Sequence, residues 1–148
     1  MMKHHLLLIV HLLAATIWVG GHLILSIRFL PQALKEKDAS IIRNFKNKFE
    51  PVGLPSLLIL LLTGILMAYD YNVTYTQWFS FEDSIEKVVS LKLLLLFITV
   101  ALAINAQLFV FPKLSSEKLV PVAIQIIAVT ILGVAMLVFG SLVRVGGL

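Results

Sequence analysis

Apolar residues form four long runs along this chain, and shorter polar segments separate the runs. The runs cover residues 6–30, 52–71, 84–111 and 117–143. A helix that crosses a bilayer needs about 20 consecutive, mostly apolar residues, and all four runs are long enough. Short connections between long helices favour antiparallel neighbours. The pattern therefore predicts one all-α domain over residues 1–148, an integral membrane antiparallel four-helix bundle.

Prolines predict where the first helix ends and the second begins. Pro31 is expected to end the first helix, because proline lacks the N–H that continues the hydrogen-bond ladder. Pro51 and Pro55 are expected in the first turn of the second helix, where that N–H is not needed. The basic stretch 40–49 predicts a short amphipathic helix on the membrane surface; a solvated charged linker is the alternative.

Acidic residues occur only at the ends of the predicted helices or between them. Asp83 or Ser84 is expected to cap the third helix, with Glu86 in its first turn, where negative charge is favoured by the helix dipole. A proton or cation pathway usually needs carboxylates inside the membrane. The interiors of the four runs contain none, which argues against a stand-alone ion pump.

Composition agrees with a membrane location. Hydrophobic residues make up 59% of the chain and charged residues 14%, against about 45–50% and about 25% in soluble domains. The chain has no cysteine, which excludes disulfides, thiolate metal sites and thiol redox chemistry. We therefore expect membrane lipid, and no nucleic acid, around this protein.

Basic residues gather on one side of the predicted membrane. They are Arg28, Lys35, Lys37, Arg43, Lys46, Lys48, Lys113 and Lys118. Because cytoplasmic loops carry the excess of Lys and Arg, we expect the 31–50 loop in the cytoplasm and both termini outside. The acidic, aromatic segment 69–83 suits the outer interface. These features predict a multi-pass protein of a bacterial inner (cytoplasmic) membrane.

All four histidines fall in or beside the first run, and none occurs elsewhere. His4, His11 and His22 return to within about 20° of one direction around a helix, and His5 lies beside that direction. We interpret His11 and His22 as ligands of a metal or cofactor inside the bundle. The alternative is that each imidazole only hydrogen-bonds a neighbouring helix. His4 and His5, near water, are candidate metal ligands or interfacial anchors.

Lys92 lies deep in the third run and is the candidate catalytic residue. At 1.5 Å per residue from the outer helix ends, His11 is about 10 Å and Lys92 about 12 Å into the membrane, so we expect them at one level. Met67 and Met136, which are candidate metal ligands, fall in the same outer half. A lysine this deep cannot easily extend to water. It is expected to be neutral or paired, unless helix carbonyls alone satisfy it.

Small residues in the first two runs allow a close approach to the helix backbones. They are Gly20, Gly21 and Gly64. Close helix packing needs such positions. A planar macrocycle between helices needs the same clearance, so the three glycines are also candidate cofactor-binding residues.

Three segments carry a resemblance to a known family. "HLLAATIWVGG" in the first run, "LTGILMA" in the second and "LKLLLLFITVALAINAQ" in the third resemble the CopD (copper resistance protein D) domain. That family consists of integral membrane proteins associated with copper uptake or handling. The resemblance covers most of the chain and implies a copper-binding membrane protein.

The same skeleton also resembles the HemJ type of protoporphyrinogen oxidase, a family of small four-helix membrane proteins. This resemblance implies that His11 ligates haem and that Lys92 is important for function. Arg28 matches the arginine that ends the first helix of that family, which makes it a further candidate cofactor-binding residue.

Three functions follow from these residues. The first is a b-type haem redox protein, an electron carrier or an oxidase-like enzyme, whose partner is a quinone or a redox protein. Since the other runs contain no histidine, haem would be five-coordinate, or use Lys92 or a methionine, or lie between the first helices of a homodimer. The second is copper handling, because His and Met suit copper. The third is a structural subunit of a membrane complex.

Overall fold

The computed structural model describes residues 2–147, and the described chain contains helices and no strand. The first rod is continuous and consists of α1 (Met2–Ile24), the π-helical turn η1 (Leu25–Phe29) and α2 (Leu30–Glu36). It is followed by α3 (Ala39–Asp70) and by a short 3-10 turn, η2 (Tyr75–Gln77). The second half holds α4 (Ser84–Asn105), the π-helical turn η3 (Ala106–Val110), the 3-10 turn η4 (Phe111–Lys113) and α5 (Leu119–Val143).

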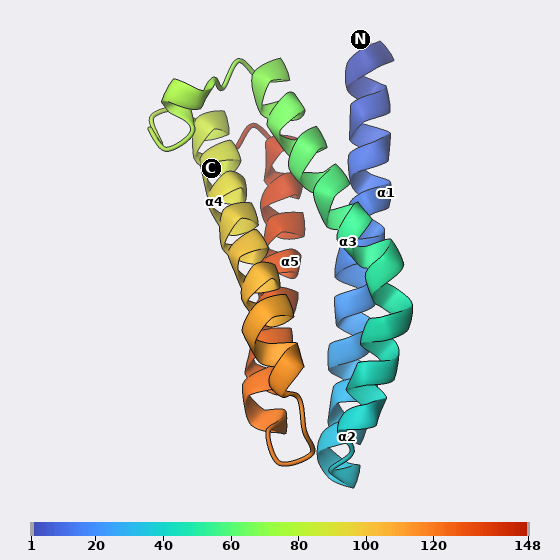
Figure 1. Ribbon diagram of the computed structural model, residues 1–148. Coiled ribbons are helices and arrows are strands. Elements are labelled where there is room, and N and C mark those ends of the chain that lie inside the picture. Colours follow the sequence, from blue (N-terminus) through green and yellow to red (C-terminus); the bar gives the residue numbers. More distant parts are fainter. Residues whose placement is uncertain (1, 148) are drawn as a thin grey trace.

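The helices pack as two antiparallel pairs, α1 with α3 and α4 with α5 (Figure 1). The pairs join mainly where α1 meets α5, and there Val19 lies 3.2 Å from the position of a Cβ on Gly133. The two ends of the described chain lie at the same end of the bundle as the segment 71–83 (Figure 1). The prediction of an all-α four-helix bundle is confirmed.

All four helical rods are long and apolar enough to cross a membrane, which makes this a multi-pass membrane protein. Many large apolar side chains face outward, among them Leu6, Leu13, Ile27, Ile124 and Ile131, each more than 60% exposed. Water would destabilise such a surface, whereas acyl chains match it. The residues buried inside, including Ala14, Trp18, Leu60 and Val129, form the contacts between helices.

The structure corrects two helix boundaries that the prolines had predicted. Pro31 does not end the first rod, which continues to Glu36. It occupies the first turn of α2, directly after the wide turn η1, where a missing N–H is tolerated. Pro51 and Pro55 lie inside α3, which begins at Ala39. The stretch 40–49 is therefore helical but is the first part of α3, and no separate surface helix forms.

Helix caps agree with the sequence at the start of α4. Asp83 is the N-cap, and its side chain and that of Glu86 form a reciprocal capping box. Glu86 is buried and accepts hydrogen bonds from Gln77 Nε2 and Ser80 Oγ, both at 2.8 Å. These bonds satisfy the carboxylate and fix the segment between α3 and α4 to the start of α4.

The π-helical turns are anchored from α5. Thr130 Oγ1 lies 2.6 Å from Ser26 Oγ in η1 and also contacts the carbonyl of His22. One helical turn earlier, Gln125 Nε2 donates to the carbonyl of Leu102, just before η3, at 2.7 Å. These side-chain contacts connect α5 to η1 and to the end of α4 just before η3.

Candidate functional site

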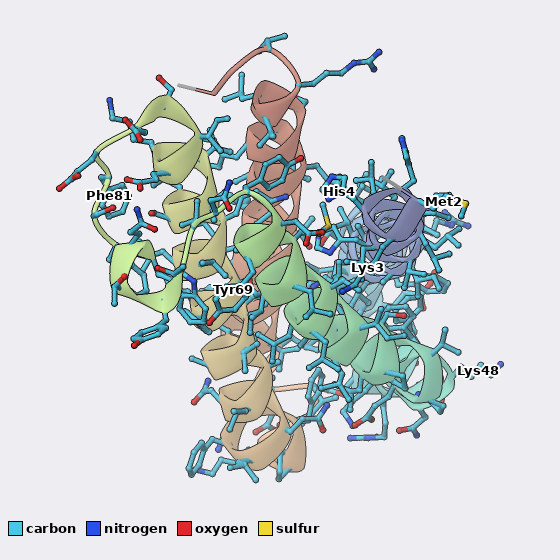
Figure 2. The ribbon with its side chains drawn as sticks, turned by 90° about the horizontal axis from the view of Figure 1, so that it is seen from above. Met2, Lys3, His4, Lys48, Tyr69 and Phe81 are labelled. Carbon is cyan, nitrogen blue, oxygen red and sulfur yellow. The ribbon has the colours of Figure 1, made fainter. Side chains whose placement is uncertain are left out.

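His4, His11 and His22 share one face of α1, as their spacing predicted, and in the structure this face is directed at α3. His4 Nδ1 lies 3.0 Å from Asp70 Oδ2, and Figure 2 shows His4 on the side of α1 turned toward the other helices. His11 Nδ1 lies 2.7 Å from Thr63 Oγ1. The ring of His22 packs edge-on against Phe49, with centroids 5.8 Å apart. The first rod therefore presents its imidazoles to the bundle at three different depths.

Hydrogen bonding assigns the tautomer of His11. The Thr63 hydroxyl has one proton, and its oxygen lies 2.6 Å from the Ile59 carbonyl, which can only accept. Thr63 therefore accepts from His11, so Nδ1 carries the imidazole proton. The lone pair is left on Nε2, the ring atom that binds a metal when the other nitrogen is held by a neighbouring group.

His11 and Lys92 lie in the same half of the bundle. Cε1 of His11 and a methyl of Leu96 flank Gly64 at 3.6 and 3.8 Å from its Cβ position. Lys92 stands one helical turn from Leu96, and its Nζ lies 3.1 Å from the Cβ position of Gly140 in α5. The imidazole and the amine thus reach into the bundle at neighbouring levels, each beside a glycine.

Lys92 is not neutralised by a carboxylate. Between residues 2 and 147 two ion pairs form, His4 with Asp70 and Lys46 with Glu50. An amine at this depth without an acidic partner can accept an anionic group of a ligand, and a buried charge gains most from such a partner.

His22 belongs to a different site from His11. Its Nδ1 lies 2.8 Å from the Trp18 carbonyl, which can only accept, so Nδ1 carries the proton and Nε2 the lone pair. Eleven residues separate the two histidines, which is about 16 Å along a helix. One metal ion or one haem iron therefore cannot bind both imidazoles of the same chain.

The remaining candidate residues do not converge on one centre. His5 and Arg28 are exposed, and Met136 packs against the apolar core that contains Ala14 and Trp18. Met67 is half-buried near the end of α3. Within the described part of the chain, no three His, Cys, Asp or Glu side chains are close enough together to hold a metal ion.

The three candidate glycines differ in what surrounds them. Gly20 has no atom within 4 Å of its Cβ position, so that side of α1 is open. At Gly21 the corresponding space is filled by the ring of Phe49, and this clearance serves helix packing. At Gly64 the ring of His11 lies in ordinary van der Waals contact with the Cβ position, at 3.6 Å. Among the three, Gly64 is the one that lies beside a candidate ligand.

Comparison with known proteins gave no relative: no protein-family model, no curated protein and no solved structure matches this chain. The site must therefore be interpreted from its own chemistry. Sequence reasoning noted Thr63 only as a small residue beside Gly64 and did not predict its hydrogen bond to His11, nor that Gly140 lies beside the amine of Lys92. The signal for Thr63 was a lone hydroxyl before Gly64 in an apolar run.

Proposed function

We propose that this protein is a membrane b-type haem redox protein in which Nε2 of His11 is an axial ligand of the iron. The observation that carries the proposal is the hydrogen bond from His11 Nδ1 to Thr63, 2.7 Å long. Haem-ligating and metal-ligating histidines are typically held this way, because the second bond fixes the ring and its tautomer.

The residues around His11 suit haem in their chemistry. The imidazole of His11 lies against Gly64 of α3, and Lys92 supplies a cationic group for a carboxylate of the cofactor or of a substrate. A second protein ligand in the same chain would be Lys92 or a methionine, since the other histidines lie at other depths. A homodimer that pairs two first helices is the alternative source of a second imidazole.

Bound haem would supply one-electron chemistry, as a carrier or an oxidase-like enzyme. The chain itself would do three things. His11 would hold the iron, Thr63 would keep the proton on Nδ1, and Lys92 would orient an anionic group. The apolar side chains of α3 and α4 would exclude water from this half of the bundle. We place the 31–50 segment in the cytoplasm, since it carries most of the basic residues.

An absorption spectrum of detergent-purified protein tests the proposal. Haem bound at His11 gives a Soret band that His11→Ala removes. His5→Ala is the matched control, because His5 is an exposed imidazole on the same helix, and it should leave the band unchanged. A protein that stays colourless when haem is supplied, or a band that survives His11→Ala, would refute the assignment.

Copper handling is the second candidate, and a pocket between the start of α1 and the end of α3 favours it. Lys3, His4, His5 and Asp70 line an open space of about 390 Å³ there. Imidazole and carboxylate suit Cu(II), although Lys3 adds a repelling charge and His4, His5 and Asp70 do not converge as three ligands in this structure. Colourless protein that binds one copper ion, and loses it in a His4→Ala, His5→Ala double variant, would favour this function. Purified protein that binds neither haem nor copper would favour the third function, a structural subunit of a membrane complex.

A further inference from the structure

A second site lies in the half of the bundle near α2, where all four rods border one cavity of about 80 Å³. Aromatic rings form its walls: Trp18, Phe45, Phe49 and Phe111. Phe45 and Phe49 are stacked with centroids 5.5 Å apart, and the Trp18 and His22 rings are 4.4 Å apart. Such walls favour a flat, apolar ring as the occupant.

The polar groups of the cavity call for a ligand that can both donate and accept. His22 offers the lone pair of Nε2, because its Nδ1 proton is given to the Trp18 carbonyl. The amide of Gln107 also lines the cavity.

Both π-helical turns border this cavity. Leu25 is the first residue of η1, and Ala106 and Gln107 begin η3. Each turn widens its helix locally, and π turns occur frequently at functional sites. Thr130 and Gln125 of α5 contact the helix carbonyls just before the two turns, so hydrogen bonds between helices accompany both turns at the cavity.

We propose that this cavity binds the head group of a lipid-soluble quinone or hydroquinone. The flat ring fits between the aromatic walls. A hydroquinone hydroxyl donates to His22 Nε2, and a quinone oxygen accepts from the Gln107 amide. The polyprenyl tail leaves between the helices, where the outer surface is already apolar. A haem is a much larger macrocycle than a single quinone ring, and a cavity of about 80 Å³ is too small for it.

This site is separate from His11, and binding there does not require haem. Electron exchange between the two sites, in contrast, rests on the proposed haem function. The spacing of about 16 Å between His11 and His22 along α1 places the two centres in opposite halves of one membrane protein. A measurement of quinone binding without a redox readout therefore tests the cavity independently of haem.

Trp18 can report on its own cavity, because the chain has two tryptophans. Trp78→Phe leaves Trp18 as the single indole. Titration of this variant in detergent with a short-tailed ubiquinone should quench its fluorescence saturably, with a defined Kd. His22→Phe keeps an aromatic ring but removes the acceptor, and it should weaken binding about 10-fold or more, the loss of one buried hydrogen bond.

Controls separate this proposal from the haem proposal and from simple partitioning. His11→Phe removes the proposed haem ligand and should leave the quinone Kd within about twofold. Thermal unfolding confirms that each variant is folded, and Gln107→Leu offers a second cavity variant if His22→Phe is not. Quenching that never saturates would overturn the proposal. So would quenching that is the same in both cavity variants as in the Trp78→Phe parent. If a saturated fatty acid displaces the quinone as well as another quinone does, the proposal is also overturned, because the cavity then binds a lipid chain.

Discussion

The ring of Phe49 in α3 occupies the space that a side chain at Gly21 of α1 would need. The same ring fills the Cβ position of Gly53 in its own helix. One aromatic side chain thus sits in a notch made by two glycines, where α1 and α3 cross. The notch sets the distance between these helices and forms one wall of the cavity beside His22.

Gly21→Ala should therefore destabilise the protein. The added methyl collides with Phe49, and overpacking of this kind costs about 1–3 kcal/mol. Gly20→Ala is the matched control, because nothing lies within 4 Å of that Cβ position and alanine favours a helix over glycine by about 0.5–1 kcal/mol. Thermal unfolding in detergent compares the two. Equal melting temperatures would show that Phe49 moves freely and that the notch has no structural role.

Thr63 should control haem binding through His11. Thr63→Val keeps the shape but removes the hydroxyl that accepts from Nδ1, and loss of such a partner lowers metal affinity by about 10–100-fold. Thr63→Ser retains the hydroxyl and should keep nearly full affinity. Haem titration followed at the Soret band measures both. Valine and serine variants with equal affinity would show that Thr63 only packs.

Lys92 should matter for function and little for folding. The methionine side chain in Lys92→Met is similar in length to lysine and is apolar. We therefore expect an intact helix bundle with an altered haem spectrum or altered turnover. Gly140→Ala places a methyl about 3.1 Å from Nζ and should change the same readouts less, by displacing the amine. An unchanged spectrum and unchanged turnover in Lys92→Met would remove this residue from the site.

Acid should weaken the start of α3 through Asp38. Its carboxylate accepts a hydrogen bond from the Ser40 backbone N–H at 2.9 Å, and the Ser40 bonds together with Arg43 hold the pKa of Asp38 below its ordinary value of 3.8. The stabilisation is complete above that value and is lost as the pH falls through the lower folded pKa.

Asp38→Asn keeps the capping oxygen and removes only the charge. Thermal unfolding of this variant should depend less on pH in the acid range than that of the wild-type protein. Asp38→Ala, which removes the cap as well, should unfold at a lower temperature at every pH. Identical acid sensitivity of wild type and Asp38→Asn would contradict the role assigned to the carboxylate.

The orientation in the membrane can be tested because the chain has no cysteine. Lys48→Cys and Tyr75→Cys each introduce one thiol on an exposed residue, at opposite ends of the bundle. With the 31–50 segment inside, an impermeant maleimide added to intact cells should label Tyr75→Cys alone, and Lys48→Cys only after permeabilisation. The reverse pattern would invert the topology.

The four spans were predictable because a bilayer demands long apolar runs, and no tertiary information is needed to find them. The capping of α4 was predictable for a similar reason, since Asp83 and Glu86 act within one turn of the chain. The shared face of His4, His11 and His22 follows from helix periodicity alone. In each case the determining interaction is local or periodic.

Other features depend on contacts between helices and could not be predicted in this way. The continuation of the first rod through Pro31 requires the wide turn η1, which Thr130 on α5 supports. The tautomer of His11 depends on Thr63, which is 52 residues away in the chain. Phe49 at Gly21 and the aromatic cavity arise from the crossing of α1 and α3. These are tertiary effects, which hydropathy does not encode.

The π-helical turns have a consequence for how such a bundle can evolve. A π turn holds about one residue more than an α turn, so the helix beyond it is rotated by about 100° relative to an uninterrupted one. In the first rod, Leu25 and Leu30 are buried at 6% and 3%, while Ile27 between them is 72% exposed. A single residue inserted into a helix therefore redirects the side chains beyond it, while the four-helix topology stays the same.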